Sequence, residues 1–341
     1  MLKKSLVLML AILMVVSLVA GCAQKGPSDG GGQPKEEVKP VILKMSVTTP
    51  EGSSWTKGAY KFAELVKERT NGKVEVNVYP NEQLSGGNQG KGIEMLMTGA
   101  TDLSFHSNII YSIMDERFGV ISLPWLLPTY EKADEKIKGA GGEKVAELLL
   151  EKNVVALGFG ENGFRQITNN KRPIATPDDM KGLKIRVPGI KMYISLYKAL
   201  GADPTAMNFA EVFTSLQQGA IDGQENPLDV IHSAKLYEVQ KYISLWNYSY
   251  DAIILGMNKD KFESFDKETQ DILRQAAIEA CEYQVELNRA NGEDQLAFFK
   301  EQGMQVTEVT DEQIKAFQEK VKPVYDEYEP IVGKELLDLF R

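Results

Sequence analysis

Two arginines in the middle of the chain have side chains suited to binding a small anion. Arg165 follows Asn-Gly-Phe at positions 162–164, and Arg186 interrupts the apolar stretch 183–187 just before Pro188. A guanidinium offers a planar fork of donors that matches a carboxylate. Taken alone, either arginine is more often found in a structural ion pair or on a solvated strand face than in contact with a ligand.

A dense polar loop follows the arginines, with the sequence Asp-Gly-Gln-Glu-Asn-Pro at positions 222–227. Ordinary turns have the same composition, so the loop alone does not indicate a site. Arg186 is more informative because it ends an expected strand, and open α/β sheets bind ligands at their strand ends. These features favour ligand binding but do not name the ligand.

The sequence has few features of an enzyme. The chain has two histidines, His106 and His232, and neither has a recognisable catalytic partner, although His106 is expected to border a cleft. We find no Ser-centred nucleophile elbow, no metal-ligand spacing and no phosphate-binding loop. The acidic pairs have no spacing typical of glycoside hydrolysis. A secreted enzyme stays open as the less favoured alternative, and we expect no cofactor and no metal.

The first residues predict export and a lipid anchor. Two lysines precede an apolar run over residues 6–20, which is too short for a membrane-spanning helix. The run closes on Leu-Val-Ala-Gly-Cys at 18–22, which resembles the lipobox of bacterial lipoproteins. Residues 1–21 would then be a lipoprotein signal peptide, with Cys22 as the acylated first residue. The alternatives are an ordinary signal peptide or a buried anchor helix with a chance cysteine.

Residues 22–39 are rich in Gly, Pro, Ser and charge, which is typical of a flexible tether. An acylated Cys22 would hold the protein to the outer face of the cell membrane, in the periplasm of a two-membrane cell. The mature chain has one other cysteine, Cys281, which is expected to be a buried apolar filler. We therefore expect no disulfide within the chain.

The acidic balance of the chain bears on its partners. It has 39 basic and 48 acidic residues, a formal net charge of −9. Removing the two lysines of the signal leaves 37 basic residues and a net charge of −11. Nucleic-acid binding needs clustered basic residues, so we expect no nucleic-acid partner. A single buried arginine can still bind an anionic ligand, because it acts locally.

Strands and helices alternate along the body of the chain. Residues 74–78 alternate Val with polar residues and predict a strand. Residues 59–66 carry Ala and Phe at helical spacing and predict a helix with one buried face, which Asn71-Gly72 ends. Further strands are expected at 44–49, 102–105, 154–158, 165–168, 183–187 and 252–257. This alternation is typical of a parallel α/β sheet.

A long helix is expected from about residue 266 to residue 303, with Asn291-Gly292 as the one interruption. If continuous, it would extend roughly 55 Å at about 1.5 Å per residue, which is longer than one small lobe. Some three hundred residues follow the tether, and that length suggests two lobes rather than one core. We therefore expect the helix to bridge two lobes.

Several motifs together resemble a known family. They are Arg165-Gln166 with Asn169 and Pro173-Ile174, Lys-Gly-Leu-Lys-Ile-Arg-Val-Pro at 181–188, Gly-Ala-Asp-Pro at 201–204, Asn-Phe-Ala-Glu-Val at 208–212 and the loop 222–227. As a set they resemble the solute receptors of tripartite ATP-independent periplasmic (TRAP) transporters, of the DctP type. Matching segments run from about residue 44 to residue 328, which is nearly all of the mature body.

The resemblance implies a two-lobed α/β fold like that of periplasmic binding proteins, with hinge-crossing strands and a long bridging helix. Lobe I would comprise residues 40–162 and 251–290, and lobe II residues 163–250 and 291–341. The lobes would close over a ligand by a hinge motion. The implied partners are a small organic acid and the small and large subunits of a membrane permease driven by an ion gradient.

The same resemblance assigns roles to four side chains. Arg186 would bind the ligand carboxylate in a salt bridge. Arg165 would be a second donor to a carboxylate or hydroxyl. Asn226 would clamp the ligand with its amide, and Phe209 would form a wall of the pocket.

Other side chains are expected to complete the cleft: Thr48, Ser107, Asn108, Trp125, Asn247 and Tyr248. The aromatic rings among them could equally belong to the core. Sugar-acid-binding relatives carry acidic side chains at some of these places, whereas this chain has Gly87 and Ser107. The difference favours a compact dicarboxylate, a keto acid or an aromatic acid over a polyhydroxylated, sialic-acid-like ligand.

A receptor for an ABC importer or a sensor kinase could use the same architecture, since a fold does not fix a function. The motif at 222–227 and the long helix favour the TRAP type. The sequence therefore predicts a solute receptor, with these two receptor classes as the first alternative and an enzyme as the second.

Overall fold

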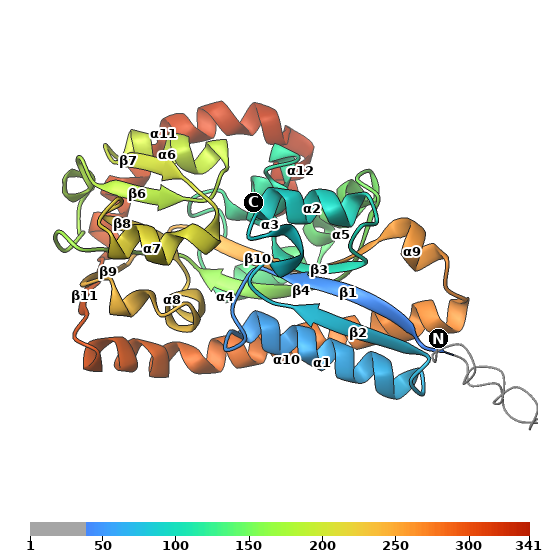
Figure 1. Cartoon of the computed structure of the whole chain (residues 1–341). Helices are drawn as coiled ribbons and strands as arrows, with labels where there is room; N and C mark the ends of the chain where they lie inside the picture. The colour runs from blue at the N-terminus through green and yellow to red at the C-terminus, as the bar shows by residue number, and fades with distance from the viewer. Residues whose placement is uncertain (1–38) are drawn as a thin grey trace, which may run out of the picture. The chain divides into compact units, whose positions relative to one another are not determined.

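The computed structural model describes residues 39–341, so the predicted signal peptide, Cys22 and all but the last residue of the predicted tether lie outside the described residues. Residues 39–341 are built on two β-sheets with helices around them (Figure 1). None of the helices in this range has both the length and the apolar character that crossing a bilayer requires. The two sheets confirm the predicted two-lobed α/β fold.

The first sheet contains β1 (Val41–Val47), β2 (Val74–Tyr79), β3 (Leu103–Ser107), β4 (Val154–Phe164) and β10 (Tyr250–Asn258). Their order is β2-β1-β3-β10-β4. β1 pairs in parallel with β2 and β3, whereas β10 runs antiparallel to β3 and β4. The sheet is therefore mixed rather than fully parallel, because β10 enters it from the other half of the molecule.

The second sheet contains β5 (Gln166–Asn169), β6 (Lys184–Val187), β7 (Asp203–Ala206), β8 (Gly223–Asn226), β9 (Tyr242–Leu245) and β11 (Gln305–Glu308). Their order is β11-β9-β5-β8-β6-β7. β6 pairs in parallel with β7 and β8, while β5 is antiparallel to β8 and β9. The carboxyl ends of β6 and β8 thus lie at the same edge of the second sheet.

Two short segments connect strands of the two sheets directly, and both contribute to the site. β4 and β5 are separated by a single residue, Arg165, and the return from β9 to β10 runs through residues 246–249. The Arg165 amide donates to the Ser249 carbonyl at 3.0 Å, so the two crossings are joined. Gly163 has a φ of +96°, which a side chain would strain, and it gives β4 its turn into the crossing. Arg165 consequently lies at the junction of the two sheets.

Helix α1 (Ser54–Arg69) follows the predicted pattern. The side chain of Ser53 caps its N-terminus. Ala59, Phe62 and Val66 are fully buried in a cluster with the first sheet. The expected helical spacing of apolar residues therefore identifies the face that packs on that sheet.

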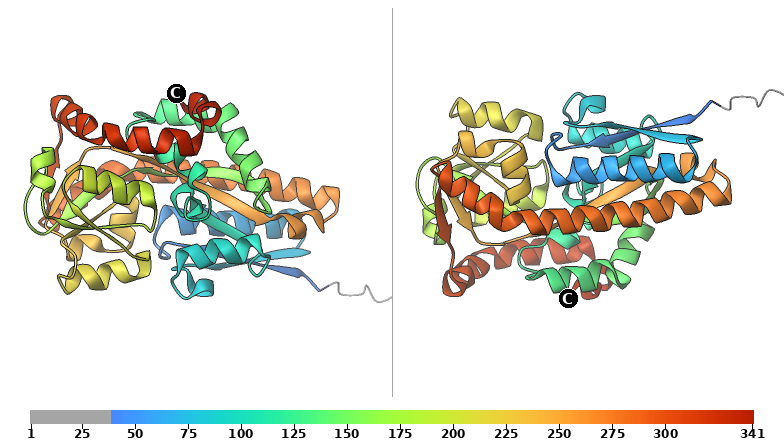
Figure 2. Two further views of the ribbon diagram at one scale, coloured as in Figure 1. Left: turned by 90° about the horizontal axis from the view of Figure 1, so that it is seen from above. Right: turned by 90° about the horizontal axis from the view of Figure 1, so that it is seen from below.

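Helix α10 (Lys267–Glu301) is a single helix of 35 residues, and Asn291-Gly292 does not interrupt it. At about 1.5 Å per residue it extends about 52 Å. It packs on α1 and β4 in the first half and on α8 (Leu228–Ser233) in the second, and Figure 2 shows it running along both. The approach to β4 is close, since a Cβ on Gly158 would lie 2.9 Å from the Sγ of Cys281. Cys281 is buried, as predicted.

The remaining helices are α2 (Gln89–Met97), α3 (Asn108–Tyr111), α4 (Tyr130–Ile137), α5 (Ala140–Leu150), α6 (Lys191–Ala199), α7 (Val212–Gln217), α9 (Lys259–Glu263), α11 (Asp311–Val332) and α12 (Lys334–Phe340). α11 packs against α6 and also against the 3-10 helix Glu116–Ser122 of the first half, and α12 packs against α5. The predicted assignment of residues 291–341 wholly to lobe II therefore omits contacts with the first half.

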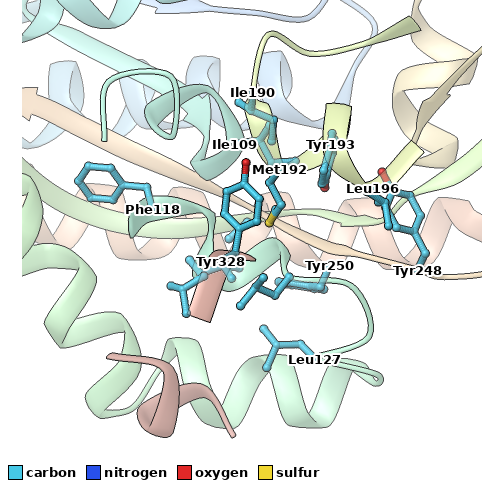
Figure 3. Packing of buried hydrophobic residues seen from close by; sticks show 14 of the residues in the cluster. Ile109, Phe118, Leu127, Ile190, Met192, Tyr193, Leu196, Tyr248, Tyr250 and Tyr328 are labelled. Carbon is cyan, nitrogen blue, oxygen red and sulfur yellow. The ribbon is translucent and has the colours of Figure 1, made fainter. Parts of the chain in front are cut away.

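A buried apolar cluster extends from the first half into the second behind the crossing segments (Figure 3). Tyr193 of α6 lies beside Tyr248 of the second crossing, with their ring centroids 5.7 Å apart. Tyr250 of β10 and Tyr328 of α11 belong to the same cluster. Burial of each such ring contributes about 1.5–3 kcal/mol. The cluster supports the crossing segments that hold Arg165.

Candidate functional site

A cavity of about 30 Å³, here called the central cavity, lies where strand ends from the two sheets meet. Six residues predicted from the sequence line it: Thr48, Ser107, Arg165, Arg186, Phe209 and Asn226. Polar and aromatic residues that were not predicted also line it: Thr49, Trp55, Gln89, Asn162 and Asp251. The structure therefore brings these six predicted residues together at one cavity, with further polar residues that the sequence prediction did not include.

Arg186 reaches the central cavity from the end of β6 with 2% of its surface exposed. Its Nε and Nη2 donate to the Met207 carbonyl at 3.1 and 2.8 Å. Within residues 39–341 it forms no salt bridge. Burial lowers the pKa of Arg186 to about 10, although the nearby Glu225 charge acts in the opposite direction. The side chain is still a cation at neutral pH.

A buried cation without a counter-ion is costly, and a charge of opposite sign offsets the cost. The ring of Phe209 covers one side of Arg186, with the guanidinium carbon 5.8 Å from the ring centroid. The Met207 carbonyl occupies another edge. The edge that faces the central cavity is where an anion would be stabilised most.

Arg165 is also buried, with 3% of its surface exposed, but carboxylates surround it. Its Nε donates to the carboxylate of Glu225, and its Nη1 donates to the carboxylate of Asp251. Nη2 donates to the Glu225 carbonyl at 2.9 Å and to Asn226 Oδ1 at 3.1 Å. Burial alone would lower the pKa of Arg165, but the charges of Glu225 and Asp251 raise it well above its usual value.

These contacts limit what Arg165 can offer a ligand. A guanidinium has five N–H donors, and the contacts to Glu225, Asp251 and Asn226 occupy all but one, on Nη1. Two carboxylates already share its single positive charge. The predicted role of a second ligand donor is therefore reduced to one N–H group.

Asn226 lies at the end of β8 with its amide largely engaged. Its Nδ2 donates to Gln224 Oε1 at 2.6 Å, and its Oδ1 accepts from Arg165. The second N–H of Nδ2 is left for a ligand. Asn226 thus links the Arg165 network to the cavity wall.

The first sheet contributes Thr48, just after β1, and Ser107, at the end of β3. Thr48 Oγ1 donates to Glu82 Oε1 at 2.8 Å, and Ser107 Oγ donates to Asp251 Oδ1 at 2.5 Å. Both hydroxyls line the central cavity, as predicted. Each has already given its proton to a carboxylate, which leaves lone pairs for a ligand.

A buried acid–base pair lies behind Thr48. Glu82 Oε1 and His106 Nε2 are 2.5 Å apart, and both side chains are buried. Burial raises the pKa of Glu82, but His106 and the hydroxyls of Thr48 and Ser46 outweigh it, and the pKa falls below its usual value. His106 does not line the cavity and supports its wall from behind, through Glu82 and Thr48.

Within residues 39–341 no group of three or more His, Cys, Asp and Glu side chains is arranged to hold a metal ion.

Two predicted residues of the first half face away from the central cavity. Asn108 is fully buried, and its Nδ2 donates to the Phe118 carbonyl and to Ser122 Oγ, both at 3.0 Å. Trp125 packs edge-on against Trp246, with centroids 5.9 Å apart. Neither residue lines the central cavity, because local hydrogen bonds and packing within the fold occupy both side chains.

Two predicted residues of the second crossing also lie behind the cavity. Asn247 Oδ1 accepts from Gln166 Nε2 at 2.5 Å, and Asn247 lines a different pocket on that side. Tyr248 is buried in the aromatic cluster, with its hydroxyl donating to Glu225 Oε2 at 2.6 Å. Asn247 has a φ of +44°, which breaks the alternation of a regular strand. Tyr248 supports Glu225 instead of touching a ligand.

The most important residue that the sequence reading missed is Asp251. It lies near the start of β10, is fully buried, and accepts from Ser107, Arg165 and Asn162. Burial raises the pKa of Asp251 even though Arg165 acts to lower it. An acidic residue just before an apolar strand was a signal for this role, since a buried charge needs partners.

Hydrogen bonds at two places connect the halves beside the cavity. The amide of Phe209 donates to Gln89 Oε1 at 3.1 Å. Asp229 of α8 accepts from the amide and the hydroxyl of Ser54, at 3.0 and 3.1 Å, at the N-terminus of α1. A carboxylate is stabilised at a helix N-terminus. These contacts hold the two halves together over the central cavity.

Comparisons with known proteins are consistent with this geometry. The model of the family described as "bacterial extracellular solute-binding protein, family 7" (DctP) matches residues 45–330. The C4-dicarboxylate-binding periplasmic protein DctP of Rhodobacter capsulatus is 32% identical over 301 residues, which is 88% of this chain and 90% of that protein.

Two solved structures are similar over most of the chain. A TRAP periplasmic solute-binding protein of Ralstonia eutropha, with bound (S)-2-acetolactate, is 36% identical with a TM-score of 0.86, covering 88% of this chain and 97% of that one. The sugar acid binding protein of Advenella mimigardefordensis, in complex with galactonate, is 32% identical with a TM-score of 0.85, covering 89% and 98%. Each bound molecule carries a carboxylate.

Proposed function

The chain belongs to the bacterial extracellular solute-binding proteins of family 7 (DctP) and is a receptor of the TRAP type for small organic acids, and we propose that Arg186 binds the ligand's carboxylate. The family consists of solute receptors and is not a known class of enzymes. The receptors of this family are periplasmic or extracytoplasmic.

The observation that carries the proposal is the state of Arg186. It is buried at the wall of the central cavity and forms no salt bridge within residues 39–341. A carboxylate placed in the cavity would supply the missing counter-ion and accept two parallel N–H bonds. Asn226 and the remaining Nη1 donor of Arg165 would support the ligand from the side.

Closure of the two halves is part of the proposed mechanism. A cavity of about 30 Å³ holds about two water molecules, so an organic acid enters only when the halves part. As they close, the bonds from Phe209 to Gln89 and from Ser54 to Asp229 form around the ligand. Water is excluded, and the ion pair with Arg186 strengthens in the lower dielectric.

Delivery is the second part of the proposal. The closed receptor would dock on a membrane permease with a small and a large subunit, driven by an ion gradient. Cys22, outside the described residues, would carry the lipid that keeps the receptor at the outer face of the membrane. Labelling of growing cells with a radioactive fatty acid tests the anchor, and a Cys22→Ser variant should lose the label. Equal labelling of the variant would contradict a lipid on Cys22.

A thermal-shift screen of the mature chain tests the binding site. Mono- and dicarboxylates, keto acids, aromatic acids and sugar acids are each added in excess, and a ligand raises the melting temperature by mass action. The shift should vanish in Arg186→Ala and nearly vanish in Arg186→Lys, because lysine lacks the planar fork. Arg274→Ala is the matched control, since Arg274 is exposed and packs on Phe262. Wild-type affinity in Arg186→Ala would rule out the proposed role.

A further inference from the structure

We propose that the central cavity selects a monocarboxylate that carries a hydroxyl group over a dicarboxylate, an inference that rests on the proposed role of Arg186. Two properties of the cavity wall support it: the number of free charges and the direction in which its hydroxyl groups point their protons. The number of free charges depends on Glu225 and Asp251, and the direction of the protons depends on Glu82 and Asp251. The resemblance assigned no role to these carboxylates.

The charges around the cavity leave one cation for a ligand. Arg165 lies between Glu225 and Asp251, and both carboxylates bind it directly. Asp251 accepts from three donors, Ser107, Asn162 and Arg165, which is the pattern of an ionised carboxylate. Arg186 alone has no carboxylate partner among these groups. One ligand carboxylate can pair with Arg186, whereas a second would lie near Glu225 and Asp251, two carboxylates that share the single cation Arg165.

The hydroxyl groups of the first half present lone pairs to the cavity. Thr48 gives its one proton to Glu82, and Ser107 gives its proton to Asp251. Ser107 Oγ also accepts from the Ile109 amide, which leaves it one lone pair. An ionised carboxylate is an acceptor without a proton, so it cannot bond to these oxygens. A ligand hydroxyl can donate to either of them.

Glu82 fixes the direction of the Thr48 proton. Its carboxylate accepts from Ser46 Oγ at 3.1 Å and Ser85 Oγ at 3.2 Å, and it contacts His106. Gly92 leaves room for it, because a Cβ there would lie 2.7 Å from Glu82 Oε2. These contacts keep Glu82 in place, so the Thr48 proton has a fixed ionised acceptor at 2.8 Å.

The amide of Gln89 is consistent with this selection. Its Oε1 accepts from Phe209, and its Nε2 donates to no group within residues 39–341. Two neutral N–H donors can support a carboxylate on Arg186 or the oxygen of a hydroxyl. They add no charge that would stabilise a second carboxylate.

This inference departs from the expectation of a compact dicarboxylate, a keto acid or an aromatic acid, which rested on the lack of acidic side chains at Gly87 and Ser107. Asp251, on β10, supplies a carboxylate to this cavity, since it lines the cavity and accepts a hydrogen bond from Ser107. A site that bonds a hydroxyl rejects analogues that lack it, because its own polar groups are then left unpaired.

The test compares matched acids by isothermal titration calorimetry on the mature chain, refolded from denaturant to remove any bound ligand. The probes are butyrate, 2-hydroxybutyrate, 3-hydroxybutyrate, 2,3-dihydroxybutyrate and succinate. At least one hydroxy acid should bind about tenfold or more tightly than both butyrate and succinate. Succinate as the tightest ligand would overturn the inference.

Variants then assign the selectivity to the hydroxyls. Thr48→Val or Ser107→Ala should reduce the ratio of hydroxy-acid affinity to butyrate affinity by about tenfold, because a ligand hydroxyl loses its acceptor. Thr98→Val, at an exposed position, is the matched control and should change nothing. Glu82→Ala frees the Thr48 proton, so the ratio of hydroxybutyrate to succinate affinity should fall. Full selectivity in both Thr48→Val and Ser107→Ala would contradict the inference.

Arg186→Ala separates the two proposals. Loss of binding in this variant together with a preference for succinate in the wild type would refute the hydroxyl selection and leave the role of Arg186 intact. Unchanged binding in Arg186→Ala would refute the role of Arg186 itself. No binding by any acid of the panel, in a chain that melts cooperatively, would count against both.

Discussion

Arg165 and Arg186 are buried to nearly the same degree, with 3% and 2% of their surfaces exposed, but their surroundings differ. Two carboxylates hold Arg165 and raise its pKa, whereas Arg186 has no salt bridge within residues 39–341, and burial lowers its pKa. Arg165 links the crossing segments to β8 and β10. Arg186 is left to pair with an anion from outside the chain.

The comparison shows that burial alone does not identify a binding residue. A buried charge that is paired within the protein stabilises the fold. Its removal lowers the free energy of unfolding, because its partners then stay buried without a counter-charge. A buried charge without partners gains most when a ligand arrives. The two arginines should therefore respond to substitution in opposite ways, in stability and in binding.

The largest effect is expected for Arg165→Ala. This change leaves Glu225 and Asp251 buried without their cation, and we expect a loss of about 3–5 kcal/mol in the free energy of unfolding. Denaturant unfolding followed by tryptophan fluorescence measures it. Wild-type stability in this variant would break the comparison, because Arg165 would then not be a structural cation.

A smaller effect is expected for Tyr248→Phe, which removes a hydrogen bond to the same network. The Tyr248 hydroxyl donates to Glu225 Oε2 at 2.6 Å, and a bond to a charged group contributes about 1.5–3 kcal/mol. The free energy of unfolding should fall by about that amount. Ligand affinity should fall far less than in Arg186→Ala, and an equal fall would place Tyr248 at the ligand.

Asp229 extends the comparison to a buried carboxyl group that forms no salt bridge within residues 39–341. Burial raises its pKa, although bonds from Ser54 act to lower it. A raised pKa in the folded state means that its contribution to stability is complete below the pKa of an unperturbed aspartate, about 3.9, and is lost as pH rises through the folded value. Asp229→Asn avoids that loss and keeps an acceptor for Ser54.

The free energy of unfolding of Asp229→Asn should therefore exceed that of the wild type at pH 7. The difference should shrink as pH falls toward about 4, where the aspartate is protonated in both states. Denaturant titrations across this pH range measure it. A difference that grows at low pH would show that Asp229 is stabilised as an anion in the fold.

The smallest effect on stability is expected for Arg186→Met. The apolar side chain fills a similar volume and removes a cation that lacks a salt bridge, so the free energy of unfolding without ligand should change by less than about 1 kcal/mol. Binding of organic acids should be lost in the same variant. A loss of stability as large as that in Arg165→Ala would show that the two arginines play the same part.

The sequence predicted the parts of the fold that local patterns control. The apolar spacing in residues 59–66 identified the buried face of α1, and the long helix was found because no strong breaker interrupts it. Arg186 was placed correctly at a strand end, since its apolar neighbours and the following Pro188 mark that end.

The surroundings of Arg165 could not be predicted in this way. Its partners Glu225 and Asp251 lie 60 and 86 residues further along the chain. Antiparallel pairing of β5 with β8 and of β4 with β10 brings them together. The two arginines therefore looked equivalent in the sequence, and the resemblance gave both to the ligand.

Tyr248 lies away from the predicted cleft for a related reason. The positive φ of Asn247 turns the second crossing, so Tyr248 does not follow the alternation of a regular strand. Asn adopts this conformation more readily than most other residues, so Asn247 was the available sign of the turn. The ring is buried beside Tyr193 instead.

The small volume of the central cavity also has a consequence for rates. An acid enclosed in such a space cannot dissociate while Phe209 and Gln89 stay bonded across it, so release is no faster than the parting of the halves. Motions of this kind take microseconds to milliseconds or longer. Ligands of different affinity can then share one dissociation rate and differ in how often they are captured. The residence time of the solute would be a property of the receptor, set by the contacts between its halves.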